Sequence, residues 1–386
     1  MGSRYSKAAV LGMSLLLLTS CGGNSSSPAP SSPGYTPAVS PSETIRPDEA
    51  LQLEPTLEQR ELFNFINTQL TGPDGVYTNL QETSESAEVA TGHEILSESA
   101  SLLMEAAVRT RNQELFDRQW TQARRTFDME GGFSYRFSPK QQKQFNVNAA
   151  VDDLRMIGAL LEAGQVFNQP EYTREADKYG KRFYKNNIKK DYMFDMFDNL
   201  YKVVNESVTL CYIDLSVLQK LSISSELQEN LLMNMSGILE EGYLSDSFPF
   251  YETRFDYKTG KYSSEGINSV ESLLTILHLA ETGRQKPASI SYIKAQVAAG
   301  TLFGQYTREG QPANDIRSTA IYALTAMIGA VLGDSSLYQS SIERMNEFRV
   351  TDPASPLYGG FGDPAARQAY SFDNLMALLA YSYKAP

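Results

Sequence analysis

From residue 56 onward the chain repeats one helical pattern, and this repeat restricts the fold more than any other feature. Leu62, Phe63, Ile66 and Leu70 recur at the spacing of one helix face. Short turn sequences, as at 72–75, separate such segments. Eleven further helices are expected at 95–109, 113–127, 148–167, 172–184, 206–221, 225–239, 268–281, 289–299, 315–332, 335–348 and 372–383.

Every second helix of this series is the more apolar one. Residues 316–332 and 273–279 are apolar nearly all round, which is typical of a buried helix, whereas 172–184 carries many charges. Six buried and six outer helices predict an all-α fold, an (α/α)6 toroid or barrel of six helix hairpins. Alternating strand patterns are scarce, so only small β-hairpin insertions are expected, near 133–137 and 248–262.

The inner helices are expected to begin with polar residues, about 45 to 60 residues apart, as in a supersecondary repeat. Asp, Ser and Asn at a helix start are explained by capping alone. If the inner helices are parallel, however, all six starts meet at one face, and their carboxylates converge where positive helix ends favour anions. The starts are Ser97-Glu98-Ser99, Asp152-Asp153, Asn205-Glu206-Ser207, Asn268-Ser269, Asn314-Asp315 and Asp373-Asn374.

The N-terminus has the pattern of a secretory signal. Arg4 and Lys7 precede an apolar run at 8–18 that is too short for a membrane span. The sequence Leu18-Thr19-Ser20-Cys21 resembles the lipobox of bacterial lipoproteins, which implies cleavage before Cys21 and acylation of its thiol. We therefore expect a signal peptide at 1–20, a Ser/Pro-rich tether at 21–54 and a folded domain at 55–386, held outside the cytoplasm on a membrane.

Charge and residue counts limit the partners. The formal net charge of −12 argues against nucleic acid, because a phosphate backbone is held mainly by Lys and Arg. It permits a neutral or cationic substrate. Beyond Cys21, only Cys211 remains, in an apolar segment typical of an inert core residue. His93 and His278 are far apart in sequence, so we expect no structural zinc site. We also expect no cofactor and a monomer.

Two segments resemble glycoside hydrolase family 8, an (α/α)-toroid family, and the resemblance covers about residues 55–383. The sequence Thr91-Gly92-His93-Glu94-Ile95-Leu96-Ser97-Glu98-Ser99 is similar to the family's Ser-Glu segment, and the run at 115–120 also matches. This likeness implies that Glu98 is the general acid.

The family's second motif is similar to the sequence at 149–156. The resemblance implies that Asp153 contacts the sugar at the cleavage point. Val151 stands where the family has its first Asp, and Asp152 lies beside it as a further candidate for substrate binding.

The general base is less clearly marked. The family's base segment is similar to 267–271, but Asn268 stands at the base position and has no basic carboxylate, which leaves it as a candidate for substrate binding. The loop before that helix offers Glu252 and Asp256, and we favour Asp256, with Tyr257 lining the sugar site. Asp315 is the reserve. Asp256 also fits a simple turn residue.

The resemblance implies an inverting, endo-acting glycosidase whose two carboxyl groups lie about 6.5–9.5 Å apart. Trp120 is the only tryptophan and is expected in the core, which argues against cellulose as substrate. An exopolysaccharide or biofilm matrix polymer, including one of amino sugars, suits an anchored acidic protein. The alternatives are a glycan-binding lipoprotein without activity and another toroid enzyme, such as a polysaccharide lyase that uses His93.

Overall fold

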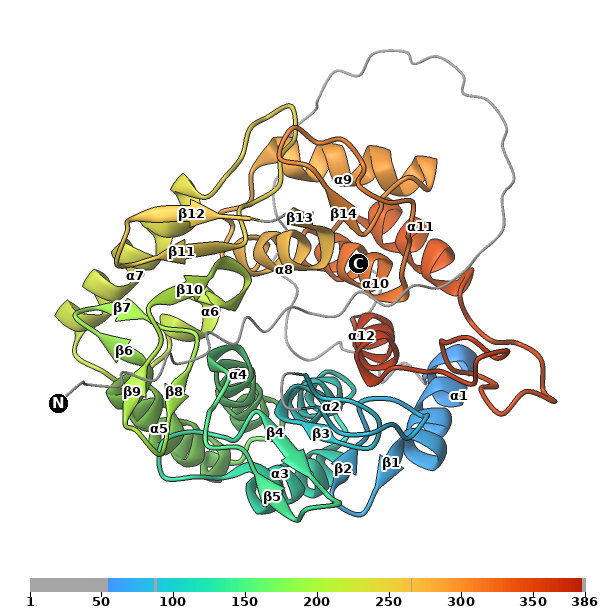
Figure 1. Ribbon diagram of the computed structural model, residues 1–386, viewed down its shortest axis with the longest axis horizontal. Helices are drawn as coiled ribbons and strands as arrows, with labels where there is room; N and C mark the ends of the chain where they lie inside the picture. Colours follow the sequence, from blue (N-terminus) through green and yellow to red (C-terminus); the bar gives the residue numbers. More distant parts are fainter. Residues whose placement is uncertain (1–54, 87–88, 265, 384–386) are drawn as a thin grey trace, which may run out of the picture.

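A computed structural model describes residues 55–86, 89–264 and 266–383 of the chain. The expected signal peptide, Cys21 and the tether lie outside these residues. Within the described part, twelve α-helices form two concentric layers around one axis (Figure 1). None of these helices combines the length and the apolar run needed to cross a bilayer.

The inner layer consists of α2 (Ser97–Arg109), α4 (Ala150–Val166), α6 (Leu215–Leu218), α8 (Ser269–Ala280), α10 (Thr319–Val331) and α12 (Ser371–Ser382). The outer layer consists of α1 (Leu57–Phe65), α3 (Gln113–Phe127), α5 (Pro170–Asn187), α7 (Ser225–Glu241), α9 (Pro287–Ala299) and α11 (Ser335–Asn346). Helix α10 is buried along its whole first three turns, whereas α5 buries one face only. The predicted (α/α)6 barrel is confirmed.

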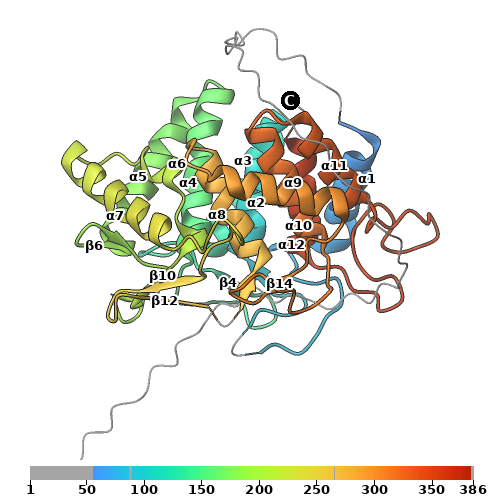
Figure 2. The same cartoon turned by 90° about the horizontal axis from the view of Figure 1, so that it is seen from above.

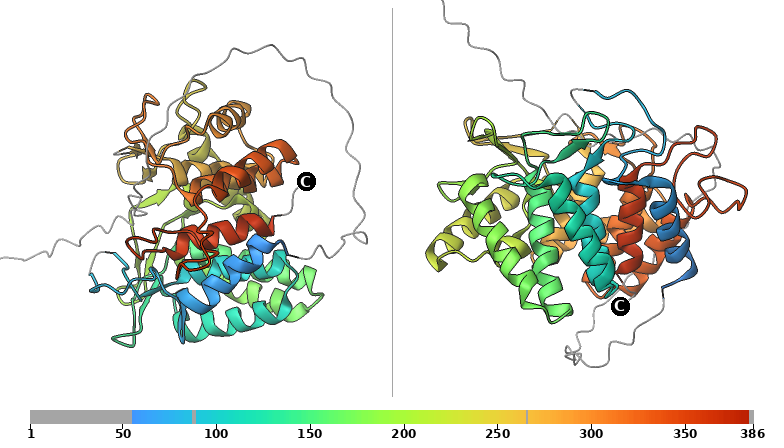
Figure 3. Two further views of the ribbon diagram at one scale, coloured as in Figure 1. Left: turned by 90° about the vertical axis from the view of Figure 1, so that its right-hand side faces the viewer. Right: turned by 90° about the horizontal axis from the view of Figure 1, so that it is seen from below.

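Short antiparallel strands lie at one end of the barrel (Figure 2). Because β3 runs directly into α2 and β13 directly into α8, this is the end at which the inner helices begin. The C-terminal residues of α12 lie at the opposite end (Figure 3). The strands are β1 (Thr71–Gly72), β2 (Gly75–Val76), β3 (Ile95–Leu96), β4 (Arg136–Ser138), β5 (Lys143–Gln144), β6 (Ile188–Lys189), β7 (Tyr192–Met193), β8 (Phe197–Asp198), β9 (Val203–Val204), β10 (Ser207–Thr209), β11 (Arg254–Asp256), β12 (Lys261–Ser263), β13 (Ile267–Asn268) and β14 (Gln305–Tyr306).

Two of the expected helix starts are wrong. Residues 206–221 do not form one helix, because Ser207–Thr209 pairs with β11 as strand β10. A 3-10 turn follows, and then α6, a single turn that Asp214 caps. Helix α10 begins at Thr319 rather than near Asp315, since Ser318 supplies the capping oxygen. Asp315 therefore lies in an exposed loop ahead of the helix.

The aromatic core behaves as expected. Trp120 is 4% exposed and makes edge contacts with Phe133 and Tyr179, so it belongs to the packing between α3 and α5. Cys211 is buried and free. Burial raises the pKa of its thiol, which keeps the sulfur protonated and unreactive.

Candidate active site

A cavity of about 340 Å³ opens at the end of the barrel where the inner helices begin. Helices α2, α4 and α12 each contribute the residues of their first turns, and the loop at 89–92 forms a wall. Its lining combines acidic, aromatic and aliphatic side chains, a composition that suits sugars. The lining includes Glu98, Tyr135, Asp152, Arg155, Tyr212, Tyr370, Phe372 and Asp373.

Glu98 lies in the first turn of α2, and the strand before it fixes its position. Strand β3 pairs with β4, and the Ser97 amide donates to the Tyr135 carbonyl at 3.0 Å, so the helix starts at a defined place. Burial, and then the charge of Asp152, raises the pKa of Glu98 to about 8, although Arg155 opposes the shift. Glu98 consequently holds a proton at neutral pH, as a general acid must.

Asp152 is the second buried carboxyl group of this cavity. Its Oδ2 accepts a hydrogen bond from Ser97 Oγ at 2.6 Å, and Arg155 lies 3.5 Å from its Oδ1. Burial raises the pKa of Asp152, while Arg155 and Ser97 favour the carboxylate. Arg155 also donates to Ser101 Oγ at 3.2 Å, which ties α4 to α2. The positive charge of Arg155 therefore stabilises the ionised forms of both Glu98 and Asp152.

Asp153, the residue that the resemblance assigned to sugar contact, is not among the described residues that line the cavity. Adjacent helical residues point about 100° apart, and at the start of α4 it is Val151 and Asp152 that line the cavity. Asp153 instead accepts from the Phe133 amide at 3.2 Å and from Asn148 at 2.9 Å. Burial raises its pKa to about 7. Through the Phe133 amide, Asp153 supports the segment that leads into β4.

Asp373 enters the cavity from the first turn of α12. The amide of Ala320 donates to its Oδ1 at 3.0 Å, and burial raises its pKa. A hydrogen bond of 3.3 Å between Ser99 Oγ and Ser371 Oγ brings the starts of α2 and α12 together. The sequence signalled Asp373 only as one of six polar helix starts.

The predicted base Asp256 ends strand β11, where its Oδ1 accepts from the amide and hydroxyl of Thr259 at 2.7 and 2.8 Å. These bonds hold its pKa below the ordinary value. Tyr257 donates to the Met193 carbonyl, and Asn268 caps α8 through the Val270 amide at 2.9 Å.

Among the described residues, the side chains that line the cavity do not include Asp256, Tyr257, Asn268 or Asp315. Glu252 is also elsewhere, because it pairs with Arg308 and accepts a hydrogen bond from Ser264.

A buried ion pair fixes the wall of the cavity next to Glu98. Arg136 donates to both carboxylate oxygens of Glu94, at 2.7 and 2.6 Å, and both side chains are 1% exposed. The Thr91 amide donates to the same carboxylate at 2.9 Å. Burial raises the pKa of Glu94, against the pull of Arg136. The pair thereby joins the loop at 89–92 to strand β4.

His93 lies beside this wall but is occupied. Its ring stacks on Tyr77 with the centroids 4.1 Å apart, and its Nε2 lies 3.1 Å from the Leu80 carbonyl. These contacts give His93 a structural role, as a partly buried and paired histidine commonly has.

Comparison with known proteins agrees with the barrel fold. No family model matches the chain. The chain is 28% identical over 74% of its length to a Bacillus subtilis (strain 168) protein named "Putative lipoprotein YdaJ", of which it covers 78%. The solved structure of endoglucanase Cel10 from Klebsiella pneumoniae, a family 8 glycosyl hydrolase, has a TM-score of 0.56 at 14% identity, over 83% of this chain and 98% of that one.

The class is thus a barrel with the fold of glycoside hydrolase family 8, as the sequence resemblance implied. A structure described as a novel α-amylase from Clostridium perfringens is nearer. It is 32% identical, with a TM-score of 0.79 over 85% of this chain and 98% of that one. The chain belongs to one family with that Clostridium protein.

Proposed function

We propose that this protein is an inverting glycoside hydrolase in which Glu98 is the general acid. The observation that carries the proposal is a carboxyl group with a pKa near 8 inside a cavity that holds two further carboxyl groups. At neutral pH Glu98 can donate its proton to a leaving glycosidic oxygen. The pKa of Asp152 is also raised, and its charge keeps Glu98 protonated when Asp152 is ionised.

We assign the general base to Asp373. It shares the cavity with Glu98 from a neighbouring helix start, and a raised pKa makes a carboxylate a stronger base. Asp256 and Asp315 are the competing assignments made from sequence. Replacing each by Asn separates the three. Azide needs no general base, so it should restore turnover, with a glycosyl azide as product, only in the variant that lacks the group that activates water.

Two observations bear on the substrate. Besides the protonated Glu98, Asp152 and Asp373 share the cavity with Arg155, which makes it unfavourable for an acidic polymer such as a uronate chain. Tyr135, Tyr212, Tyr370 and Phe372 supply aromatic faces for neutral rings. The matching Clostridium protein is described as an α-amylase, which favours an α-linked glucan. An exopolysaccharide or biofilm matrix polymer of neutral or amino sugars is the second candidate and follows from the expected anchor at Cys21.

The test is release of reducing ends from soluble starch, a mixed-linkage β-glucan, chitosan and matrix polymer purified from the producing cells. We expect activity on one of the neutral or cationic polymers, with inversion at the new anomeric carbon seen by NMR. A rapid fall in viscosity relative to reducing ends would support endo action. Absence of product from every polymer, with retained binding, would favour the glycan-binding alternative, and an ultraviolet-absorbing unsaturated product would favour a lyase.

We also propose that the mature chain is anchored by a lipid on Cys21. The name of the Bacillus subtilis relative supports this assignment. In cell fractionation, the wild-type protein should sediment with membranes and Cys21→Ala should appear in the soluble extracytoplasmic fraction. Equal distribution of the two proteins would contradict the anchor.

A further inference from the structure

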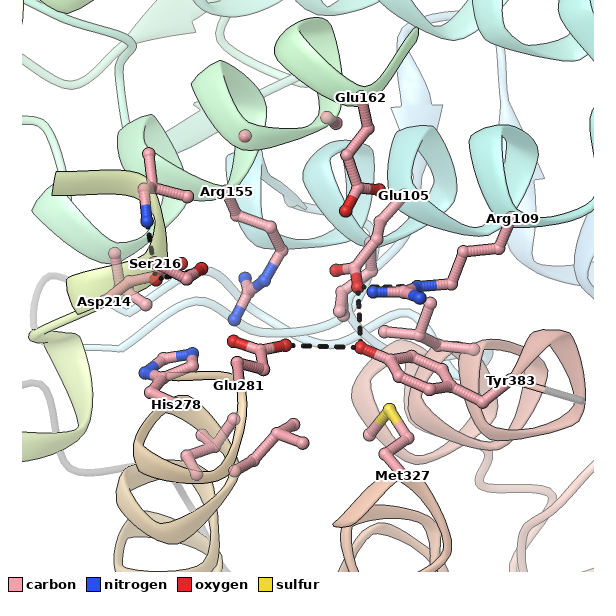
Figure 4. Close-up of a pocket in the computed structure, with 18 of the residues that line it drawn as sticks. Glu105, Arg109, Arg155, Glu162, Asp214, Ser216, His278, Glu281, Met327 and Tyr383 are labelled. Carbon is pink, nitrogen blue, oxygen red and sulfur yellow. Dashed lines mark hydrogen bonds and ion pairs between the residues drawn. The ribbon is translucent and has the colours of Figure 1, made fainter. Parts of the chain in front are cut away.

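A second cavity, of about 70 Å³, lies farther along the barrel axis, towards the ends of the inner helices. Ionisable side chains from α2, α4 and α8, together with the N-cap of α6, face one another in it (Figure 4). They are Glu105, Arg109, Glu162, Asp214, His278 and Glu281. This group is separate from the Glu98 cavity, although Arg155 borders both.

The cluster has an excess of carboxyl groups. Four acids face Arg109 and Arg155, and Lys220 is exposed at the rim. All four acids are partly buried around this small cavity, so water and salt screen their mutual repulsion poorly. The last turns of α2, α4 and α8 also carry negative partial charge, which disfavours carboxylates there. A cation inside the cavity would relieve both effects.

Three side chains offer ligand atoms close together. One ring nitrogen of His278 and one carboxylate oxygen each of Asp214 and Glu281 lie within 4.8 Å of one another. Asp214 is held in place because its Oδ1 accepts from Ser216 Oγ at 2.7 Å and from the Val217 amide at 3.0 Å. His278 and Glu281 are three residues apart at the end of α8, so they share a face.

His278 gives independent evidence for a ligand. Its side chain is only 8% exposed, and its Nδ1 is buried without a hydrogen-bond partner. A buried ring nitrogen with no partner is costly. A neutral imidazole can offer a ring nitrogen to a metal ion. Figure 4 shows its ring beside Glu281 and Asp214.

We propose that Asp214, His278 and Glu281 bind a divalent transition-metal ion of the zinc type. One imidazole and two carboxylates suit Zn²⁺, whereas Ca²⁺ and Mg²⁺ prefer oxygen ligands alone. The cavity of about 70 Å³ leaves room for water to complete the coordination. The ion joins the short helix α6 to the end of α8. The proposal is independent of the catalytic one.

The spacing of the ligands explains why the sequence argued against a zinc site. That expectation rested on the absence of clustered Cys and His, and here only one histidine takes part. His278-Leu279-Ala280-Glu281 provides two ligands on one helical face, but the third, Asp214, comes from a turn that sequence patterns assigned to a continuous helix.

Calorimetric titration of ZnCl₂ into the metal-stripped full chain tests the site. We expect one ion per chain with a micromolar or tighter Kd, and no comparable heat with CaCl₂. Asp214→Asn, His278→Gln and Glu281→Gln should each weaken zinc binding by about 100-fold or more. Glu162→Gln is the matched control, since it neutralises a carboxyl group of the same cavity but leaves the three ligands, and it should change Kd by less than about 10-fold.

Thermal unfolding gives a second readout. Excess Zn²⁺ should raise the Tm of the wild type and of Glu162→Gln, because a ligand that binds only the folded state stabilises it. Asp214→Asn keeps the capping oxygen of α6, so its metal-free Tm should stay near that of the wild type while the zinc-dependent rise is lost. No saturable binding up to about 1 mM Zn²⁺, which corresponds to a very weak site, would overturn the proposal. Equal affinity in all four variants would do the same.

Discussion

The two ends of the barrel hold similar groups in opposite electrostatic settings. At the hairpin end, Glu98, Asp152 and Asp373 lie in the first turns of parallel inner helices. At the other end, Glu105 and Glu281 lie in or beyond the last turns of α2 and α8. Helix dipoles favour anions at the first position and disfavour them at the second, by about 0.3–1 kcal/mol each at exposed sites.

The carboxyl groups at the two ends are therefore neutralised in different ways. At the hairpin end, burial outweighs the helix dipole and leaves Glu98 protonated, in a cavity large enough for a sugar. At the far end, the cavity is small and the carboxyl groups are crowded, so protons, the two arginines or a metal ion must neutralise them. A buried acid near the axis is therefore not by itself evidence of catalysis.

The largest expected effect separates the two ends by activity. Glu98→Gln should lower kcat by about 10²–10⁴-fold, because the amide cannot donate the proton. Glu162→Gln, also an acid-to-amide change but at the far end, should leave kcat within about threefold. Reducing-end assays on one substrate, with circular dichroism to confirm folding, measure both. Similar losses in the two variants would remove the functional distinction between the ends.

A second prediction concerns the wall beside Glu98. Glu94→Gln should cost about 3–5 kcal/mol of unfolding free energy, because it leaves the charge of Arg136 buried without its bidentate partner. Glu171→Gln removes an exposed pair with Arg174 and should cost less than about 1 kcal/mol. Urea unfolding of the two variants measures the contrast. A loss below about 1 kcal/mol in Glu94→Gln would show that the pair does not stabilise this wall.

Sequence periodicity was sufficient for the barrel, since a buried helix and an amphipathic helix differ in composition. The expected ranges 113–127 and 225–239 agree with α3 (Gln113–Phe127) and α7 (Ser225–Glu241) to within two residues. The periodicity gave a wrong helix at 206–221, because strand β10 forms there by pairing with β11, a segment almost fifty residues away. Local patterns carry no information on such a partner.

The site was predictable to the level of the helix starts but not of single residues. Glu98 lies in a cavity at the starts of the inner helices, where their polar residues were expected to converge. The choice between Asp152 and Asp153 depended on how α4 is rotated about its own axis. The packing of α4 against its neighbouring helices sets this rotation, and local sequence does not show it. Asp256 attracted attention through its aromatic neighbours, yet those rings pack on one another, with Phe255 and Tyr257 centroids 5.5 Å apart.

A third prediction uses Arg155, the cation shared by the two cavities. Because Arg155 lowers the pKa of both Glu98 and Asp152, Arg155→Gln should move the alkaline limb of kcat to higher pH, by about one unit. Arg109→Gln removes a cation at the far end only and should leave that limb in place. Rate profiles from pH 5 to 10 measure the shift. A shift to lower pH in Arg155→Gln would contradict the electrostatic assignment.

The smallest expected effect is on stability. The pKa of Glu98 rises from an ordinary value of 4.5 to about 8 on folding, so the folded chain binds more protons between these values. Its contribution is present below pH 4.5 and is lost as pH rises through 8. In Glu98→Gln, the amide at position 98 does not titrate. The Tm difference between Glu98→Gln and wild type should therefore grow by several degrees from pH 5 to pH 9, whereas Glu114→Gln, an exposed acid on α3, should show a constant difference. A constant difference for Glu98→Gln as well would mean that Glu98 is ionised in the folded protein, and that it cannot be the proton donor.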